Sequence, residues 1–389
     1  MTNEVRNVPD LRFPGFEGEW EESNIDNEFD FFNNKRKPIK ENLRNKGEYP
    51  YYGATGIIDY VDNFIFDGNF ILIGEDGANI VSRSAPLVYF ATGKFWVNNH
   101  AHILYPKFGD IYFNYLLLEN IDYEKYNTGT AQPKLNVQNL KKIKIKSPRD
   151  NSEQQKIGNF FSKLDRQIEL EEQKLEKLEE QKKGYMQKLF SQELRFKDEK
   201  GNDYPEWDIT TIEKIAKVSK GFTPSTKDIN LWQNDNKNWL SIAGMSDKYI
   251  YEGNKGISSA GEGKHKKVNE DTLIMSFKLT LGKLAIVKTP IYTNEAICHF
   301  EWKTDQIKTE YMYYYLSFIN IESFGAQAVK GITLNNDSIN SIVIKLPEFL
   351  EQNKISNFFT KFDELMEKQN QKIDGLKKRK KGFLQKMFV

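Results

Sequence analysis

Two sets of polar loops contain the side chains best suited to bind a ligand. They are rich in Asn, Gln, Thr and Tyr, whose amide and hydroxyl groups can hydrogen bond to the edges of DNA bases, and they lie near lysines and arginines, which suit phosphates. In the first half of the chain the candidate DNA contacts are Lys35, Arg36, Tyr52, Thr55, Arg83, Asn98, Asn99, His100, Thr128, Thr130, Gln132, Lys134 and Asn136. In the second half they are Lys220, Thr223, Ser225, Lys278, Thr280, Asn294, Gln327, Lys330, Thr333 and Asn335.

Two short motifs could suggest catalysis or metal binding instead. His100 and His102 are separated by one residue in an expected strand, which would place both rings on one face. A metal ion needs further ligands, and no third one is evident nearby, so polar contacts to a base or phosphate, or structural packing, are favoured over a metal site. The carboxylates of Glu75 and Asp76 could form an acid–base pair, but a turn after a strand explains them more simply.

Enzyme signatures are missing from the sequence. The Gly93-Lys94 and Gly282-Lys283 pairs lack the following Ser or Thr of a phosphate-binding loop. There is no Gly-x-Gly-x-x-Gly segment after a strand, no Asn-Pro-Pro-aromatic segment and no Cys-x-x-Cys pair. A nuclease or a methyltransferase is therefore disfavoured, and we expect no catalytic residue, no bound metal and no bound cofactor in this chain.

Composition favours a cytoplasmic protein of two domains. The chain has 389 residues and a formal net charge of +1, from 56 basic and 55 acidic side chains, so charge alone neither predicts nor excludes a polyanionic partner. Cys298 is the single cysteine, which excludes a disulfide framework, and the polar start of the chain does not resemble a signal peptide. The apolar runs have the length of strands, so no membrane segment is expected.

A long internal repeat divides the chain. Residues 153–190 recur 198 positions later, so that Glu-Gln-Gln-Lys-Ile at 153–157 returns as Glu-Gln-Asn-Lys-Ile at 351–355. Self-similarity of this length indicates a duplicated architecture. It predicts a first domain at 1–150, a first long helix at 151–192, a second domain at 193–348 and a second long helix at 349–389.

Both predicted helices carry an apolar seam with the 4-3 spacing of a coiled coil. The seams are interrupted at matching positions, Glu171 and Lys182 in the first helix and Gln369 and Lys380 in the second. We expect the two helices to pack antiparallel as a spacer between the domains; the alternative is that each packs on its own domain. The residues expected at the helix or partner interface are Ile157, Phe160, Phe161, Leu164, Ile168, Leu175, Leu178, Ile355, Phe358, Phe359, Phe362, Ile373 and Leu376.

The two globular halves share weaker landmarks. Leu-Arg-Phe followed by Trp occurs near the start of each half, at 11–20 and 194–207, and Leu-Asn precedes a terminal strand at 135–136 and 334–335. Between these landmarks lie short β-branched or aromatic segments separated by Gly, Asn and Asp, a pattern typical of strand-rich domains. The fold class expected is therefore α+β, with two strand-rich globular domains in pseudo-two-fold repeat, separated by a long antiparallel two-helix coiled coil.

Several of these segments together resemble the specificity subunit of type I restriction-modification systems. The resemblance spans almost the whole chain and rests on the Glu-Gln-x-Lys-Ile-x-x-Phe-Phe helices at 153–190 and 351–389, the Tyr-Tyr-Gly-Ala-Thr-Gly-Ile loop at 51–57, the Ile-Gly-Glu-Asp-Gly turn at 73–77, and Gln132-x-x-Leu135-Asn136. In the second half the spacing between Gln327 and Leu334-Asn335 is longer, so the motif departs from the pattern there.

The resemblance implies a function that the loops alone do not define. It implies two target-recognition domains, each reading one half of a bipartite site in double-stranded DNA, and helices that dock two methyltransferase subunits. Those subunits would carry S-adenosylmethionine, and two restriction or translocase subunits would use ATP and Mg²⁺. Half-sites would then lie about one helical turn, roughly 34 Å, apart. The alternatives are a stand-alone sequence-specific DNA-binding regulator, which should bind tightly without partners, and a scaffold with no role on DNA.

Overall fold

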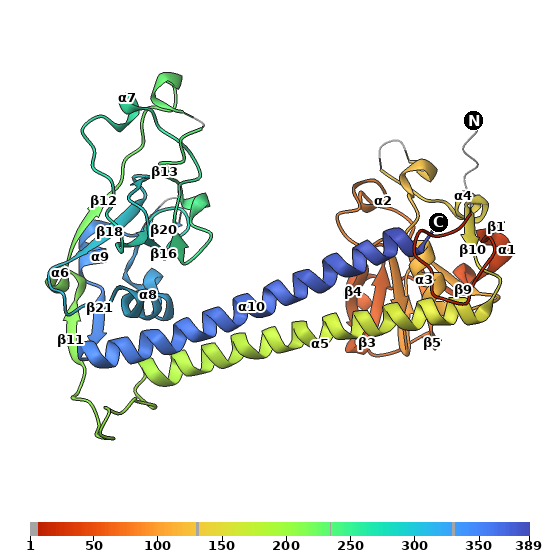
Figure 1. The fold of residues 1–389 in the computed structure, drawn as a ribbon, viewed down its shortest axis with the longest axis horizontal. Coiled ribbons are helices and arrows are strands. Elements are labelled where there is room, and N and C mark those ends of the chain that lie inside the picture. The colour runs from red at the N-terminus through yellow and green to blue at the C-terminus, as the bar shows by residue number, and fades with distance from the viewer. Residues whose placement is uncertain (1–6, 130–131, 234, 329–330) are drawn as a thin grey trace. The chain divides into compact units, whose positions relative to one another are not determined.

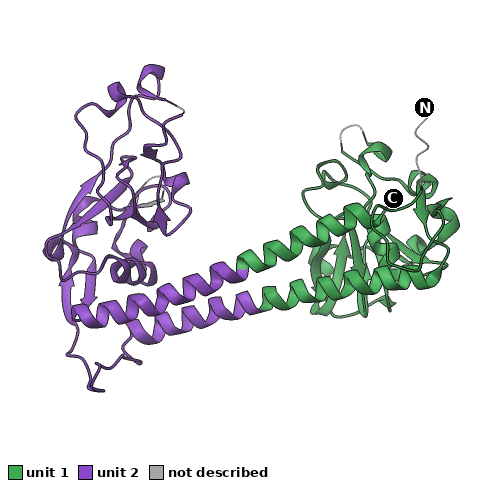
Figure 2. Ribbon diagram, in the orientation of Figure 1, with its two compact units in different colours: residues 1–173, 370–389 green, residues 174–369 purple. Residues whose placement is uncertain are grey.

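The computed structural model describes residues 7–129, 132–233, 235–328 and 331–389 (Figure 1). Helices and sheets are mixed along the chain, which confirms the α+β class. The long helices are α5 (Asn151–Phe190) and α10 (Phe349–Met387). The chain forms two compact units (Figure 2), of which unit 1 takes Met1–Gln173 and Asn370–Val389, and unit 2 takes Lys174–Gln369. Each unit therefore contains one end of each long helix.

Unit 1 is built on short strands and short helices. One sheet has the order β2-β9-β6-β7 and another the order β4-β3-β8-β5, while β1 pairs antiparallel with β10. The strands are β1 (Glu21–Asn24), β2 (Phe29–Phe31), β3 (Lys46–Gly53), β4 (Gly56–Val61), β5 (Phe66–Asp67), β6 (Phe70–Gly74), β7 (Val88–Ala91), β8 (Lys94–Val97), β9 (Ala101–Pro106) and β10 (Lys144–Ser147). The helices are α1 (Ile25–Glu28), α2 (Asn79–Ser82), α3 (Ile111–Glu119) and α4 (Val137–Lys142), with 3-10 turns η1 (Asn33–Lys35), η2 (Glu41–Leu43) and η3 (Glu124–Tyr126).

Unit 2 has a five-stranded sheet of order β12-β18-β15-β16-β14, with β11 paired to β21, β13 to β17 and β19 to β20. The strands are β11 (Asp208–Thr211), β12 (Ala216–Lys220), β13 (Trp239–Leu240), β14 (Tyr249–Ile250), β15 (Leu273–Ser276), β16 (Leu284–Val287), β17 (Tyr292–Thr293), β18 (Ile297–Trp302), β19 (Ala326–Ala328), β20 (Gly331–Thr333) and β21 (Val343–Leu346). The helices are α6 (Ile212–Ile215), α7 (Ser259–Glu262), α8 (Thr309–Phe318) and α9 (Asn336–Asn340), with η4 (Ile229–Leu231), η5 (Ile242–Gly244) and η6 (Ile321–Phe324).

The two units repeat one plan. The order β2-β9-β6-β7 of unit 1 returns in unit 2 as β12-β18-β15-β16, and the β1–β10 pair returns as β11–β21. Helix α3 corresponds to α8 and α4 to α9 in their places along the chain. The duplication seen in the long helices therefore extends through the globular parts, where few residues are identical.

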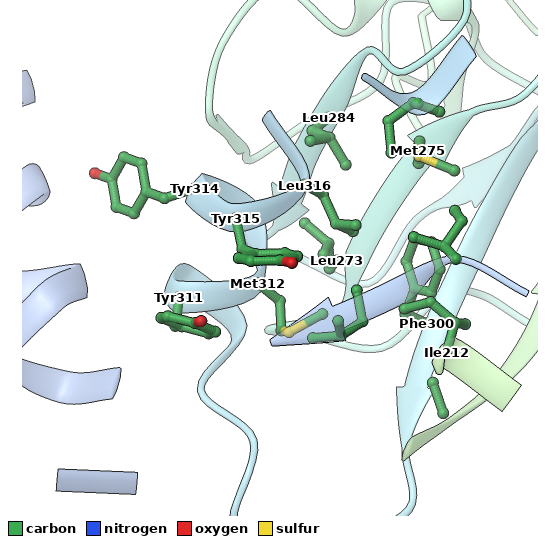
Figure 3. Packing of buried hydrophobic residues seen from close by; sticks show 14 of the residues in the cluster. Ile212, Leu273, Met275, Leu284, Phe300, Tyr311, Met312, Tyr314, Tyr315 and Leu316 are labelled. Atoms are coloured by element: carbon green, nitrogen blue, oxygen red, sulfur yellow. The ribbon is translucent and has the colours of Figure 1, made fainter. Parts of the chain in front are cut away.

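The core of unit 2 shows how the helices cover the sheet. Every residue of β15 and β16 is buried, as expected for strands covered on both faces. Side chains of α8, including Met312 and Leu316, point at Leu273 and Phe300 of the sheet (Figure 3). Phe359 of α10 belongs to the same buried cluster. A long helix is therefore part of the domain core as well as of the helix pair.

The apolar seam serves two kinds of packing. At the ends of the helices it enters the domain cores: Ile157 and Phe161 join the core of unit 1, and Ile355 joins that of unit 2. In the helix pair of unit 1, Leu164 and Ile168 cluster with Leu376. The remaining seam residues are buried in the case of Ile373 and partly buried in the case of Phe160, Leu175, Leu178, Phe358 and Phe362. Both packing modes considered from the sequence are therefore present.

Ion pairs involve the seam interruptions Glu171, Lys182 and Lys380 and show the helix direction. In unit 1, Asp165 pairs with Lys380 at 2.6 Å, whereas Glu171, further along α5, pairs with Lys372, which lies earlier on α10, at 2.9 Å. The two helix segments therefore run antiparallel. In unit 2, Lys182 pairs with Asp363 at 2.5 Å, which is the same pair with the two helices exchanged.

Each long helix is also tied to the segment that enters its unit. Arg12 donates to Glu153 through Nε at 2.7 Å and Nη2 at 2.8 Å. In unit 2, Arg195 donates to Glu351, and the Trp207 indole donates to the same carboxylate at 2.9 Å. Both glutamates are fully buried. The Leu-Arg-Phe landmarks therefore recur because their arginines neutralise a buried carboxylate at the helix start.

Across the described ranges, none of the helices has the length and apolar character needed to cross a membrane.

Candidate nucleic-acid interface

In unit 1, three segments far apart in the sequence meet where β6 ends. Glu75 follows β6, and its backbone N–H donates to the carbonyl of His100 at 2.8 Å. Its own carbonyl accepts from the Leu135 N–H at 2.7 Å, and Asp76 forms an isolated bridge with Lys134. The turn at 75–76, the turn before β9 and the segment before α4 therefore form one surface, which we call the unit 1 site.

Arg36 and Glu75 form the charged centre of the unit 1 site. The guanidinium donates to Glu75 at 2.7 Å and to the carbonyls of Asn99 and Ala101 at 3.2 and 3.1 Å. The Lys134 ammonium lies 3.5 Å from the same carboxylate. Burial would raise the pKa of Glu75, but the hydrogen bond from Arg36 and the nearby positive charges outweigh it and hold that pKa below its ordinary value. Arg36 thus supports the site from inside, whereas Lys134 is about half exposed.

The prediction that both histidines lie in one strand was wrong, because β9 begins at Ala101. The two side chains have different roles. His100 lies in the turn before β9, and its Nδ1 is 2.6 Å from Asp76. His102 lies within β9 and is buried; its Nε2 donates to the Leu135 carbonyl at 2.7 Å, which leaves Nδ1 to accept from the Asn33 amide at 3.0 Å. Burial lowers the pKa of His102. Only His100 is therefore accessible to a ligand.

The segment before α4 is closed by its own hydrogen bonds. The Asn127 side chain accepts from the backbone N–H of Lys134 at 2.8 Å, and Thr128 N–H donates to the Lys134 carbonyl at 2.8 Å. Asn136 is the N-cap of α4, since its side-chain oxygen accepts from Asn139 N–H at 2.9 Å. Thr130, a predicted contact, lies outside the described residues.

The other predicted residues of unit 1 divide into supporting and exposed groups. Tyr52 is a core residue with its ring against Phe95, Arg83 is held by Glu119 at 3.0 Å, and the buried Asn98 accepts from His100 N–H. These side chains are better placed to shape the surface than to touch a ligand. The exposed group comprises Lys35, Thr55, Asn99, His100, Thr128, Gln132 and Lys134.

The end of β15 in unit 2 has the same backbone arrangement with different side chains. Phe277 follows β15 and its carbonyl accepts from Leu334 N–H at 3.3 Å, as Glu75 accepts from Leu135. Lys220 and Lys278 place their ammonium groups 5.7 and 5.6 Å from the Phe277 ring centroid. An ion pair in unit 1 is thus replaced by cation–π contacts in unit 2, where both lysines are exposed. We call this surface the unit 2 site.

Polar loops surround the unit 2 site. The Asn294 amide donates to the Thr223 hydroxyl at 2.8 Å. Asn335 caps α9, since its side chain accepts from Ser338 N–H at 2.7 Å. Ser225 and Thr280 are exposed, and Thr333 is partly exposed. Lys330 lies outside the described residues, and for Gln327 only the backbone, in β19, is described.

Part of the surface beside the unit 2 site was not predicted from the sequence. A pocket of about 250 Å³ lies next to β12 and β18. Its lining includes Lys266, Lys267 and His265, together with Lys220 from the predicted set. The run of basic residues at 264–267 was visible in the sequence, but nothing local indicated that it faces β12.

The arrangement in both units suits binding better than chemistry on a substrate. Exposed hydroxyl, amide and ammonium groups surround a rigid sheet end, which is what hydrogen bonding to base edges and phosphates requires. Among the described residues there is no cluster of three or more His, Cys, Asp or Glu side chains that could hold a metal ion.

Comparisons with known proteins agree with this description. The model of the type I restriction modification DNA specificity domain matches the chain twice, at residues 17–180 and 204–378. A Haemophilus influenzae protein provisionally named a type I restriction enzyme specificity subunit is 27% identical over 90% of this chain and 89% of its own length. The MjaVIII specificity subunit of Methanocaldococcus jannaschii is 21% identical over 94% and 91%.

Solved structures show the same fold. The S subunit of a type I restriction-modification system from M. genitalium superposes with a TM-score of 0.64 at 17% identity, covering 98% of this chain and 99% of the other. A chain from a study of complex assembly in a type I restriction-modification system superposes with a TM-score of 0.58 at 12% identity, covering 97% and 98%.

Proposed function

Because this chain belongs to the family of type I restriction-modification specificity subunits, we propose that unit 1 and unit 2 each read one half of a bipartite DNA target. The chain is the non-catalytic DNA sequence-recognition subunit of such a complex and carries no cofactor of its own. DNA and the other restriction-modification subunits are its partners. No observation favours the stand-alone regulator.

The main support for the proposal is that both units have the same backbone arrangement at the end of a strand but carry different side chains there. Leu135 and Leu334 donate to the residue that follows β6 or β15, so both units present a sheet end and a capped helix in the same way. The residue at that point is Glu75 in unit 1 and Phe277 in unit 2. A scaffold shared by the two units, with different side chains at the same place, supports recognition of two different base sequences.

We assign direct DNA contact to the exposed members of the predicted set. In unit 1 these are Lys35, Thr55, Asn99, His100, Thr128, Gln132 and Lys134, and in unit 2 they are Lys220, Ser225, Lys278, Thr280 and Asn335. We add the partly exposed Asn136, Thr223, Asn294 and Thr333, which lie on the same two surfaces. The remaining described members, such as Arg36, Arg83 and Tyr52, support these residues from below. Lys35 and Lys220 would position the units through phosphate contacts, whereas Lys134 and Lys278, together with the amides and hydroxyls, would read base edges.

The long helices and the cellular setting complete the proposal. Because α5 and α10 carry the repeated sequence, each unit offers a similar helical surface, and two copies of one methyltransferase subunit could dock. In this assembly S-adenosylmethionine is held by the methyltransferase subunits, and ATP and Mg²⁺ are used by two restriction or translocase subunits. We place the complex in the cytoplasm. The division at 1–150, 151–192, 193–348 and 349–389 separates recognition domains from spacer helices.

The two-site proposal is tested with the complex of this chain and its methyltransferase partner. Lys134→Gln and Lys278→Gln each remove one exposed cation, while Lys94→Gln and Lys214→Gln remove exposed lysines outside the two sites. DNA affinity is measured on the full target and on targets with one half-site scrambled. Each site variant should bind the full target about tenfold more weakly.

The scrambled targets decide whether the units act separately. The loss caused by Lys134→Gln should vanish on DNA that lacks the first half-site and persist on DNA that lacks the second. Lys278→Gln should show the opposite pattern, and the control variants should bind like the unmodified complex. Equal losses on both scrambled targets for either site variant would show that the units do not read separate half-sites.

A further inference from the structure

The pocket beside the unit 2 site is lined by four parts of the chain. Its volume is about 250 Å³, and it lies between the end of β12, the segment before β15, the end of β17 and strand β18. We call it the β12–β18 pocket. Its lining is Ser219, Lys220, Gly221, Phe222, His265, Lys266, Lys267, Val268, Asn269, Thr272, Thr293, His299 and Glu301.

The charge of the lining is predominantly positive. Lys220, Lys266 and Lys267 contribute three ammonium groups, and in the described part of the chain none of them forms an ion pair. Glu301 is the acidic residue of the lining, and its carboxylate is 3.9 Å from Lys217 instead. Three cations without carboxylate partners around one cavity favour an anionic ligand, because each lacks an internal counter-charge.

The floor of the β12–β18 pocket is polar but neutral. His299 is buried, with Nδ1 3.2 Å from the Ser219 hydroxyl and Nε2 2.6 Å from the Thr293 hydroxyl. Burial lowers the pKa of His299 to about 4, so the ring is uncharged near neutral pH. The floor therefore offers hydrogen-bonding groups, while the lysines supply the charge.

The pocket wall adjoins the predicted DNA contacts. The rings of Phe222 and His265 stack with centroids 3.6 Å apart and planes 7° apart, so the residue before Lys266 packs against Phe222. Lys220 belongs to both the pocket and the unit 2 site, and Phe222 N–H donates to the Thr293 carbonyl beside Asn294. A DNA strand that reaches Asn294 would thus pass the mouth of the pocket.

We propose that the β12–β18 pocket seats a phosphate group of the DNA strand read by unit 2. The inference rests on the proposed function and adds a phosphate-binding site at residues 265–269 that lies outside the predicted contact set. A phosphate matches the cationic rim and the hydroxyl groups. The contact positions the duplex against the unit 2 site and does not itself distinguish bases.

The first test measures DNA affinity of the assembled methyltransferase complex as a function of salt. Lys266→Gln and Lys267→Gln are compared, singly and together, with Lys214→Gln, an exposed lysine of α6 that does not line the pocket. Affinity falls as salt rises, and each lost phosphate contact should make the slope of log affinity against log salt shallower by about 0.9. The double variant should bind cognate and scrambled DNA more weakly by the same factor, since phosphates carry no sequence information.

The second test replaces single phosphates by uncharged methylphosphonates along the second half-site. One position should weaken binding by the unmodified complex and leave the Lys266→Gln, Lys267→Gln complex unaffected, because that contact is already lost. Inorganic phosphate is also titrated into the unmodified complex, to test whether the pocket binds a free small anion.

Each outcome decides the inference. The pocket does not seat a DNA phosphate if the double variant has the same salt slope as Lys214→Gln. The same conclusion follows if every methylphosphonate position weakens the double variant as much as the unmodified complex. Binding of inorganic phosphate with an unchanged DNA slope would mean that the pocket takes a small anion instead. Failure of the unmodified complex to prefer any DNA sequence would overturn the proposed function, and the inference with it.

Discussion

Asn136 and Asn335 allow the structural and DNA-reading roles of one residue type to be separated. Both were expected to contact DNA, and both cap a short helix: Asn136 accepts from Asn139 N–H at 2.9 Å, and Asn335 from Ser338 N–H at 2.7 Å. Only the side-chain oxygen is needed for the cap. The Asn136 amide nitrogen lies 3.3 Å from the Thr128 hydroxyl, a long contact that leaves it able to donate to DNA.

Aspartate and alanine substitutions distinguish the two roles. Asn136→Ala and Asn335→Ala remove the cap and should each lower the free energy of unfolding by about 1 kcal/mol. Asn136→Asp and Asn335→Asp keep a capping oxygen, so their stability should stay within about 0.5 kcal/mol of the unmodified chain. The aspartates remove an amide donor and add a negative charge that repels phosphate, so each should weaken binding to its own half-site by about tenfold or more.

The assay pairs urea unfolding of the chain with DNA affinity of the methyltransferase complex. A stable aspartate variant with weakened binding at one half-site is the predicted combination. If the alanine variants were as stable as the unmodified chain, the capping argument would be refuted. If the aspartate variants bound DNA normally, the two asparagines would have a structural role only.

Further predictions concern the helix attachments and the buried histidine. Glu351→Ala should lower the free energy of unfolding by about 3 kcal/mol. The loss should be smaller for Glu153→Ala, because Glu351 accepts from an arginine and an indole, whereas Glu153 accepts from an arginine alone in the described contacts. Asp363→Asn should cost about 1 kcal/mol more than Asp165→Asn, since Asp363 holds two lysines. Because the folded pKa of His299 is about 4, below its ordinary value of 6.5, stability should fall on acidification from pH 6.5 to 4, by up to about 3 kcal/mol, and His299→Asn should remove that part of the slope.

Urea unfolding at fixed salt checks these three predictions, with the conservative variants Glu351→Gln and Asp363→Glu as controls. Equal losses for Glu351→Ala and Glu153→Ala would show that the indole contact contributes nothing measurable. Equal losses of stability for Asp363→Asn and Asp165→Asn would show that the ion pair between Asp363 and Lys248 contributes nothing measurable. A His299→Asn variant with the unmodified pH dependence between 6.5 and 4 would assign that slope to other groups.

The helices could be predicted from the sequence because their signals are local and repeated. A heptad seam appears twice at one offset, and the interruptions Lys182 and Lys380 recur with it, which are the positions that pair with Asp363 and Asp165. The two-unit α+β plan followed from the same repeat. What the seam could not show is that residues such as Phe161 and Phe359 leave the helix pair for the domain cores, because this depends on which strands come near.

The sites were harder to predict, because their residue roles depend on distant partners. Arg36 was selected for its charge, but Glu75, which is 39 positions away, holds it. Tyr52 lies in a polar-looking loop sequence and faces the core. Asn136 and Asn335 were expected to contact DNA, although Asn before a short helix is also an N-cap signal. Lys266 and Lys267 lie in a basic run of the sequence, but their pocket also requires β12 and β18, which are distant along the chain.

The central claim is that two units read two parts of one DNA target. We would sequence DNA with detection of methylated adenine from cells that carry this chain with its methyltransferase partner, and from the same cells without the chain. The account predicts a new methyladenine motif in two parts with a fixed unspecified gap, and loss of specificity in one part only for Lys134→Gln or Lys278→Gln. No motif, although the complex demonstrably forms, or a single uninterrupted motif, would contradict it.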